Sequence, residues 1–401
     1  MSLNLRPLLS ALRRNPTGAL LVTLQVSITL AVLVNAAWVV HQRIMKIEQP
    51  TGINTRDTFV LQIAGSSNQF NAAAAESEDL AYLRGLPGVV AATVSDGVPL
   101  TGDGGDTGLW IEPGQQGRVT LTGDLGMDQE GLKTLGVRLI AGRNFRADEI
   151  QPYVPGKQAS ASEAIVTESL AHALFPHGNA LGKTVYSGEP RTIIGIARNF
   201  MGPQLGQPAE RTIIYPRLPG QGGYYDLLVR TRAGKLDALL RVARKHIAAS
   251  HRYGVVVDAR TFAQNNRRRD SGNRNVAILL SLVTALMLAV CCLGIFGLTT
   301  FNVGSRTRQI GTHRALGARR RDVVTHFLVE NALILTGGAV LGSLLARLIG
   351  NWLTLHYAIP RLNVAYLAAG IVALLAVGEL AAWQPARRAA RIAPSVATRT
   401  V

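Results

Sequence analysis

Cysteine is almost absent from this sequence, with only Cys291 and Cys292 among 401 residues. The two lie side by side in an apolar run, a position typical of small packing residues rather than of a disulfide or a metal site. The eight histidines are scattered and form no Cys/His cluster of the kind that holds zinc. We therefore predict no metal site, and a large domain between the first two apolar runs that folds without disulfides.

A constellation of catalytic residues is also missing. No paired carboxylates and no nucleophile beside a base stand out in the sequence. The segment His177-Gly-Asn-Ala-Leu-Gly-Lys-Thr184 resembles a phosphate-binding loop, but Gly178 is one residue too close to Gly182-Lys183-Thr184. We predict a turn between a helix and a hairpin here, no cofactor in this chain, and no enzymatic activity of its own.

Long apolar runs are what the sequence does contain. A helix needs about 20 apolar residues to cross a bilayer core of roughly 30 Å. Four runs meet this length, and we predict spans over 16–40, 276–303, 328–355 and 364–384. The first run is too long for a signal peptide and no clear cleavage site follows it, so we expect an uncleaved anchor.

The basic residues predict the orientation of these spans. Thirteen arginines and the single acid Asp322 flank the spans at 1–15, 304–327 and 385–401, whereas the short loop 356–363 holds only Arg361. Because short cytoplasmic loops carry the basic excess, we predict cytoplasmic termini, a bacterial inner-membrane location and a periplasmic segment over 41–275. The net charge of +17 is thus a topology signal, and nucleic acid is not an expected partner. Residues 1–15 alternate apolar and basic side chains, which favours a short interfacial helix.

The periplasmic segment is predicted to be an α+β domain of short strands and helices. Ser77 and Thr167 are the expected N-caps of two helices. The Gly-rich stretch 103–117 is expected to be a loop. Expected strands cover 58–63, 89–94, 137–141, 164–166, 183–185, 191–197 and 225–230, and expected helices cover 77–85, 130–136, 168–175 and 236–249.

Small and charged residues inside the spans predict contacts between helices. Small side chains recur every fourth residue on the third span and let another helix approach closely; these are Gly338, Gly342, Ala346 and Gly350. We favour packing within one subunit over a dimer interface. Glu330 and Glu379 lie near the ends of their spans, where pairing with an arginine of the 304–327 loop is expected.

Several motifs of the chain are shared with a known family of membrane proteins. The cytoplasmic-loop and C-terminal motifs are Arg306-Thr-Arg-Gln-Ile-Gly311, Arg314-Ala-Leu-Gly-Ala318 and Pro385-Ala-Arg-Arg-Ala-Ala-Arg-Ile-Ala-Pro394. The periplasmic motifs are Gly136 through Gly142-Arg-Asn-Phe145, and Val166-Thr-Glu-Ser-Leu-Ala171 through Leu181-Gly-Lys-Thr184. In these motifs the chain resembles the permeases of the macrolide-exporter (MacB-like) and FtsX-like class of ABC transporters. The resemblance covers nearly the whole chain in the same order, with the same topology of one span, a large domain and three spans.

This resemblance implies a permease that pairs with a second permease and with a separate cytoplasmic ATPase, which would hold the Mg-ATP. Closure of the ATPase dimer would move the periplasmic domains, which act in the exporter branch with an adaptor protein and an outer-membrane channel to drive efflux of a small molecule or peptide. The alternatives are an FtsX-like regulator of a periplasmic partner and a lipoprotein-releasing permease. The resemblance places ATPase coupling at Arg308, Gln309, Ile310, Gly311, Arg314, Ala315, Leu316, Gly317 and Ala318. Gln309 and Thr312-His313 depart from the family pattern, and the sequence names neither the substrate nor a homo- or heterodimer.

Overall fold

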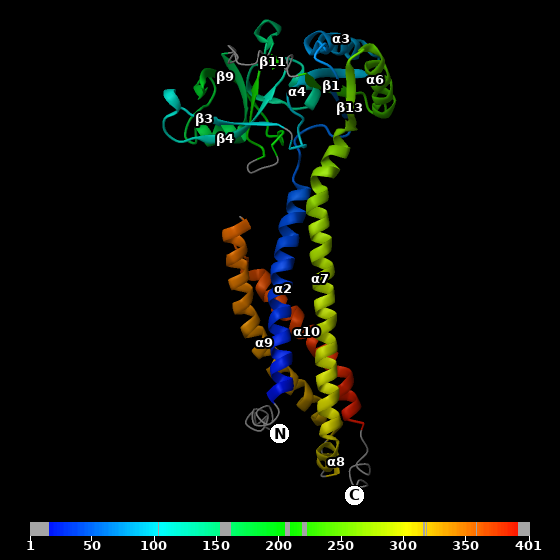
Figure 1. Cartoon of the computed structure of the whole chain (residues 1–401). Coiled ribbons are helices and arrows are strands. Elements are labelled where there is room, and N and C mark those ends of the chain that lie inside the picture. The colour runs from blue at the N-terminus through cyan, green and yellow to red at the C-terminus, as the bar shows by residue number, and fades with distance from the viewer. Residues whose placement is uncertain are drawn as a thin grey trace. The chain divides into compact units, whose positions relative to one another are not determined.

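The computed structural model describes residues 16–102, 104–152, 162–204, 209–218, 223–315, 317, 319–357 and 359–391. These residues form two compact units, one of residues 49–272 and one made by the segments on either side of it. The predicted interfacial helix over 1–15 and the tail beyond 391 lie outside the described residues. Figure 1 labels the elements of both units.

Four long helices dominate the unit made by the flanking segments: α2 (Pro16–Glu48), α7 (Phe262–Ser305), α9 (Arg320–Tyr357) and α10 (Val364–Ala389). Each contains an apolar stretch long enough to cross a membrane, which confirms the four predicted spans. The helices continue beyond those spans, since α2 runs past the predicted end at 40 and α7 begins well before 276. The extensions carry many polar residues, so they do not appear in an apolar run.

Contacts between the helices show that successive spans run in opposite directions. Gly18 lies against Leu298, whereas Gln25 donates to the carbonyl of Val290 at 2.8 Å, so α2 and α7 are antiparallel. The hydrogen bonds that α2 donates to Gly338 and Ala346 instead advance in the same direction along both helices, so α2 and α9 are parallel. Burial differs strongly among the four: 39% of the most apolar window of α2 is buried within the chain, but only 6% of that of α7.

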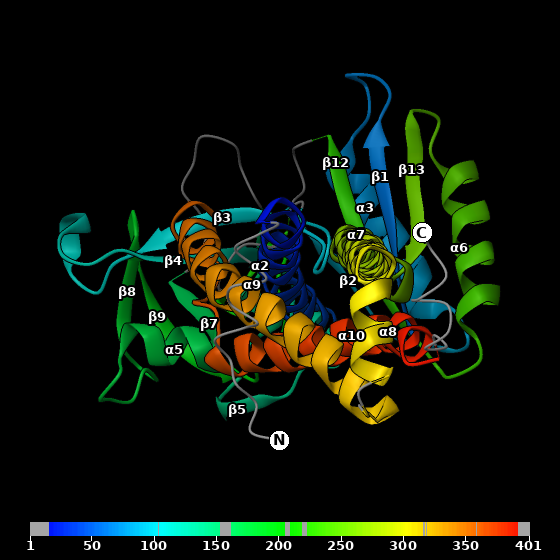
Figure 2. The same cartoon turned by 90° about the horizontal axis from the view of Figure 1, so that it is seen from below.

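The unit of residues 49–272 contains two sheets. The first has four antiparallel strands in the order β13-β1-β12-β2. Its strands are β1 (Thr58–Gly65), β2 (Val89–Ser95), β12 (Tyr224–Thr231) and β13 (Gly254–Thr261). Helices α3 (Ala72–Gly85) and α6 (Leu236–Ser250) cover one face, over a core that includes Phe59, Leu61 and Leu227 (Figure 2). The opposite face packs against α4 (Gly131–Leu135).

The other sheet is mixed and has seven strands, in the order β3-β4-β10-β7-β9-β5 with β8 paired to β9. The strands are β3 (Gly105–Leu109), β4 (Thr120–Gly126), β5 (Leu139–Gly142), β7 (Glu163–Thr167), β8 (Thr184–Ser187), β9 (Glu189–Ala197) and β10 (Thr212–Tyr215). Helix α5 (Glu168–Leu174) packs on it through Leu170 and Leu174. A separate pair joins β6 (Gln151–Pro152) and β11 (Arg217–Leu218), and short 3₁₀ turns occupy η1 (Pro113–Gln115) and η2 (Ala147–Glu149).

These sheets confirm the predicted α+β class and the hairpin around Gly188. The segment that resembles a phosphate-binding loop connects α5 to β8, as predicted. The compact unit, 49–272, is slightly shorter than the predicted domain 41–275, because α2 and α7 continue as helices at both ends.

Two local predictions were wrong, and two helix ends differ in detail from the expected ones. The Gly-rich stretch 103–117 contains strand β3, because a Cβ at Gly105 would lie 2.1 Å from Asp124 Oδ1 and glycine is needed for close strand contact. Helix α3 begins at Ala72, capped by Asn71, whose side chain accepts from the Ala74 amide; Ser77 lies inside it. Thr167 does occupy the N-cap of α5, but its hydroxyl donates to Glu210 O instead of capping. Finally, α10 continues through Pro385 to Ala389.

Candidate functional site

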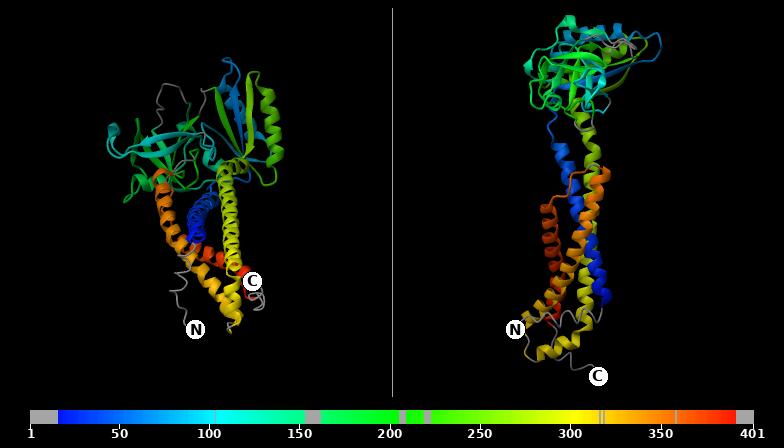
Figure 3. Two further views of the ribbon diagram at one scale, coloured as in Figure 1. Left: turned by 60° about the horizontal axis from the view of Figure 1, so that its bottom comes forward. Right: turned by 90° about the vertical axis from the view of Figure 1, so that its left-hand side faces the viewer.

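A short helix, α8 (Thr307–Ala315), joins the ends of two spans. It follows the end of α7 at Ser305 and precedes α9, and Figure 3 shows it turned across the ends of the long helices. Gly317, in the left-handed region with φ +98°, lies between α8 and α9. Asp322 accepts a hydrogen bond from the Arg319 amide at 3.0 Å and so caps the first turn of α9.

An apolar contact fixes α8 to two other helices. Ile310 is 7% exposed and packs in a small cluster with Val323 and Phe327 of α9 and with Ala386 and Ala389 of α10. This cluster also explains why α10 continues past Pro385. Proline removes one backbone hydrogen bond, but Ala386 and Ala389 are fully buried against the neighbouring helices and hold the last turn in place.

An ion pair makes a second attachment beside the first. Arg306, between α7 and α8, contacts Glu330 of α9 through Nη1–Oε2 at 2.9 Å and Nη2–Oε1 at 3.1 Å. The predicted pairing of Glu330 with a loop arginine is therefore confirmed. Glu379 Oε1 accepts from Asn331 Nδ2 at 3.2 Å, and among the side chains that the structure describes no arginine of the loop pairs with it. Arg387 lies two helical turns away, about 12 Å along α10, too far to reach it.

The predicted ATPase-coupling residues divide into two groups. Ile310 and Gly311 are buried, whereas Ala315 and Gly317 are exposed. The backbone at Arg308, Gln309 and Arg314 is helical, although the described structure does not extend to their side chains. Leu316 and Ala318 lie outside the described residues. Ile310 and Gly311 thus lie on the side of α8 that faces the helices of the same chain.

The stripe of small residues on α9 faces α2 of the same chain. A Cβ at Gly338 would lie 2.5 Å from Val26 Cγ1, and one at Gly342 would lie 2.8 Å from the Ser27 carbonyl. Gly350 lies against Asn35 in the same way, and Ala346 is fully buried. The two backbones approach so closely that a larger side chain would separate them.

Two polar side chains of α2 complete this contact, and sequence reasoning did not assign them a role. Ser27 Oγ donates to Gly338 O at 3.0 Å, and Asn35 Nδ2 donates to Ala346 O at 3.0 Å. Both are almost fully buried. The signal that could have found them is their polarity within an apolar span, because polar groups there need a protein partner.

Four candidate spans of alternating direction, with an α+β domain inserted between the first two and a short helix anchored at one end, define a class of multi-pass membrane protein. The model of the MacB-like periplasmic core domain matches residues 26–274, and that of the FtsX-like permease C-terminal matches residues 281–394. The chain therefore belongs to the MacB-like and FtsX-like family of ABC transporter permeases, which confirms the resemblance seen in the sequence.

Curated relatives carry the name macrolide export ATP-binding/permease protein MacB. The protein from Chromobacterium violaceum is 25% identical over 277 residues, which cover 67% of this chain and 42% of that protein. The protein from Shigella flexneri is 25% identical over 411 residues, which cover 96% of this chain and 58% of that protein. The chain thus spans about half the length of the curated relatives it matches.

Solved structures include two similar extramembrane domains. The periplasmic region of MacB from Actinobacillus actinomycetemcomitans covers 56% of this chain and 97% of its own, with 14% identity and a TM-score of 0.36. The extracellular domain of the noncanonic ABC-type transporter YknZ from Gram-positive bacteria covers 50% and 100%, with 16% identity and a TM-score of 0.32.

Proposed function

We propose that this chain is the permease subunit of an ABC exporter, and that it transmits force from a separate cytoplasmic ATPase to its own periplasmic domain. The observation that carries the proposal is the double attachment of α8. Its apolar side packs on α9 and α10, while Arg306 links the α7–α8 junction to Glu330. A displacement of α8 would therefore reach three spans together.

Helix α7 provides a route for that displacement. It is one continuous helix of 44 residues, ~66 Å long at ~1.5 Å per residue. Its first residue, Phe262, is fully buried in the core of the α+β domain, and its last, Ser305, adjoins α8. A helix held at both ends in this way is suited to carry motion along its axis.

The remaining parts of the proposal concern partners and placement. Two copies of this permease, or this chain and a paralogue, associate side by side in the membrane. The ATPase subunits hold the Mg-ATP. The termini and α8 are cytoplasmic and residues 41–275 are periplasmic. Efflux of a small molecule or peptide then uses a periplasmic adaptor and an outer-membrane channel. The match to a MacB-like periplasmic core domain supports the exporter role over the FtsX-like regulator and lipoprotein-release alternatives.

Purification of the tagged chain from native membranes in mild detergent, followed by mass spectrometry, tests the proposal. We expect a stoichiometric cytoplasmic ATPase together with an adaptor. An ATPase accompanied by a cell-wall hydrolase would favour the regulator, and one accompanied by a lipoprotein carrier would favour lipoprotein release. Recovery without any ATPase, also after cross-linking in intact cells, would contradict the permease role.

A further inference from the structure

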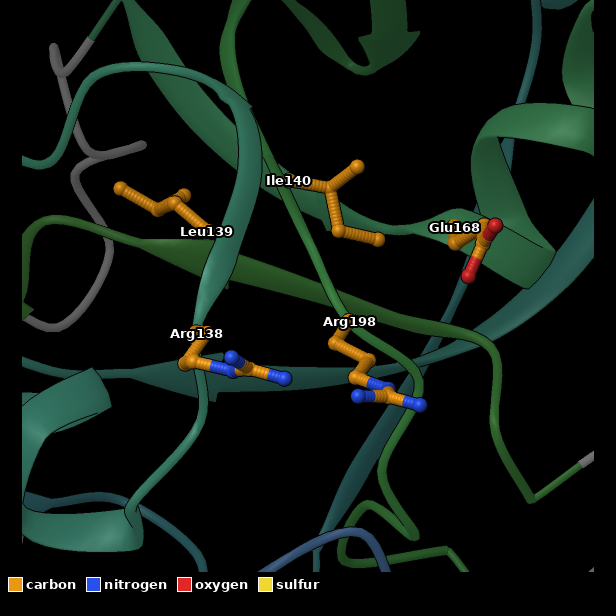
Figure 4. Close-up of a pocket in the computed structure, with 5 residues that line it drawn as sticks. All are labelled: Arg138, Leu139, Ile140, Glu168 and Arg198. Atoms are coloured by element: carbon orange, nitrogen blue, oxygen red, sulfur yellow. The ribbon is translucent and has the colours of Figure 1, made fainter.

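A hollow in the lobe of the seven-stranded sheet gathers three charged side chains that have no described role. It has a volume of about 370 Å³ and is lined by Arg138, Leu139, Ile140, Glu168 and Arg198 (Figure 4). These residues come from three places: the start of β5, the first turn of α5 and the segment that follows β9. The volume lies in the range of small-ligand pockets.

The two arginines are held close together by the sheet. The Arg198 amide donates to the Arg138 carbonyl at 2.9 Å, which continues the antiparallel pairing of β5 with β9. Figure 4 shows both guanidinium groups on the same side of the hollow. Among the residues that the structure describes, neither has a hydrogen bond or ion pair from its side chain. Two like charges placed together, with no ion pair to a carboxylate in the described structure, favour an anion that both can bind.

Other arginines of the same lobe behave differently. Arg143 and Arg146 bind Glu149, and Arg217 binds Asp96 and Asp124. The arginines of the hollow have a carboxylate nearby, that of Glu168, yet no ion pair joins them to it in the described structure. Its charges therefore remain available to a ligand.

The remaining lining gives the hollow an apolar wall. Ile140 is 54% exposed although it belongs to a strand, and Leu139 lies beside it. Figure 4 shows Ile140 on the side of the hollow that carries Glu168. An aliphatic group bound here would cover surface that is otherwise in water, which is favourable.

We propose that the hollow binds a small zwitterion with an aliphatic group. Arg138 and Arg198 would bind its carboxylate or phosphate, Glu168 would bind its primary amine, and Ile140 would contact its apolar part. Two sources share this chemistry, a short apolar peptide with both termini free and a phosphoethanolamine head group. The inference concerns the α+β domain alone and does not depend on ATPase coupling.

Isothermal titration calorimetry of the full chain in a non-ionic maltoside detergent tests it. The probes are trileucine, N-acetyl-trileucine, trileucine amide and glycerophosphoethanolamine. We expect one of the two zwitterions to bind, and its identity names the source. If trileucine is the ligand, its N-acetyl and amide derivatives bind at least about tenfold more weakly, because each loses one charged hydrogen-bonding group.

Variants identify the site. Arg138→Gln and Arg198→Gln should each weaken binding of the zwitterion about tenfold. Glu168→Gln should weaken it by a similar factor and remove the preference for a free amine. Arg118→Gln, an exposed arginine elsewhere in this lobe, is the matched control and should bind like the wild type. All four changes are at the surface, so thermal unfolding should be unaltered. No binding of either zwitterion, or binding that the hollow variants leave unchanged, would overturn the proposal.

Discussion

Arg306 and Glu330 form a two-point ion pair whose carboxylate is 4% exposed and whose guanidinium is 23% exposed. The pair is therefore asymmetric, because the arginine retains access to water and the carboxylate does not. Loss of the arginine leaves a buried charge without a partner, whereas loss of the carboxylate leaves a charge that can still be hydrated. This difference gives the junction of α7 and α8 a testable energetic signature.

We expect Arg306→Gln to destabilise the helical unit by about 3 kcal/mol, and Glu330→Gln to cost less. The double variant should recover part of the loss, since no unpaired charge remains. Thermal unfolding of the purified chain in detergent measures all three. Strictly additive losses would show that the two side chains do not stabilise each other.

The contact between α2 and α9 predicts different outcomes for substitutions at Gly337, Gly338 and Gly342 of α9. Gly338→Ala should destabilise by about 1–3 kcal/mol, because its new methyl group meets the side chain of Val26. Val26→Ala in the same chain removes the contact with Val26 Cγ1 but leaves Val26 Cβ at 2.7 Å and the Thr23 carbonyl at 3.0 Å, so it should restore only part of that loss. Gly342→Ala meets the backbone carbonyl of Ser27, so no side-chain change can relieve it.

Gly337→Ala is the matched control for these variants. Its nearest contact would be Thr23 Cγ2 at 3.9 Å, an ordinary separation, so stability should not fall. Equal effects at Gly337 and Gly338 in thermal unfolding would contradict the close approach of α2 at this register.

Two substitutions on α8 separate its anchoring from partner binding. Ile310→Asn places an amide in the apolar cluster and should lower both thermal stability and the ATP hydrolysis of the assembled complex. Ala315→Trp changes an exposed position and should reduce the amount of co-purified ATPase while stability stays unchanged. Normal ATPase recovery and normal hydrolysis in both variants would remove α8 from the coupling proposal.

The proposed orientation can be read from cysteine labelling. In a background of Cys291→Ala and Cys292→Ala, Val257→Cys lies at a site that is 66% exposed and should react with an impermeant maleimide in spheroplasts. Ala315→Cys should react only after the membrane is opened. The reverse pattern would invert the topology.

Glu149 gives the periplasmic domain an acid-sensitive contact. The side-chain hydrogen bonds from Arg143, at 2.7 and 2.8 Å, lower the pKa of Glu149 to about 2 from its usual 4.5. Because the folded pKa is the lower one, the contribution to stability is present above pH 4.5 and is lost as the pH falls toward 2.

Glu149→Gln should therefore lower the unfolding temperature by a few degrees at pH 7 and by progressively less between pH 4.5 and 2. Thermal unfolding over this range measures the difference from wild type. A difference that grows toward low pH would contradict the assigned cause of the shift. Glu130→Gln, which removes an exposed carboxylate paired with Lys133, is a suitable comparison.

The sequence predicted the spans and most strands because both depend on local patterns of apolar residues. Glycine does not distinguish a loop from a close strand contact in the sequence. Gly105 and Gly108 lie in strand β3, where they allow a close approach of neighbouring atoms. Pro385 is similar, because tertiary packing around Ala386 overrides the local preference to end the helix.

The sites depend on residues that are distant in the sequence. An ion pair between Glu330 and an arginine could be predicted, because Glu330 lies near the end of its span and the adjoining loop is rich in arginine. The hollow brings Arg138 and Glu168 together through the pairing of β5 with β9 and the packing of α5, and no local pattern encodes that register.

The low burial of α7 ties this chain to the thickness of its membrane. Its apolar stretch, 276–303, would be ~42 Å long as a helix, whereas the hydrocarbon core of a bilayer is roughly 30 Å thick. Only 6% of its most apolar window is buried within the chain, so this excess length must be covered by acyl chains or by a paired permease. A helix of this length must incline, or the bilayer around it must thicken, so a change in membrane thickness carries an energetic cost that falls on α7.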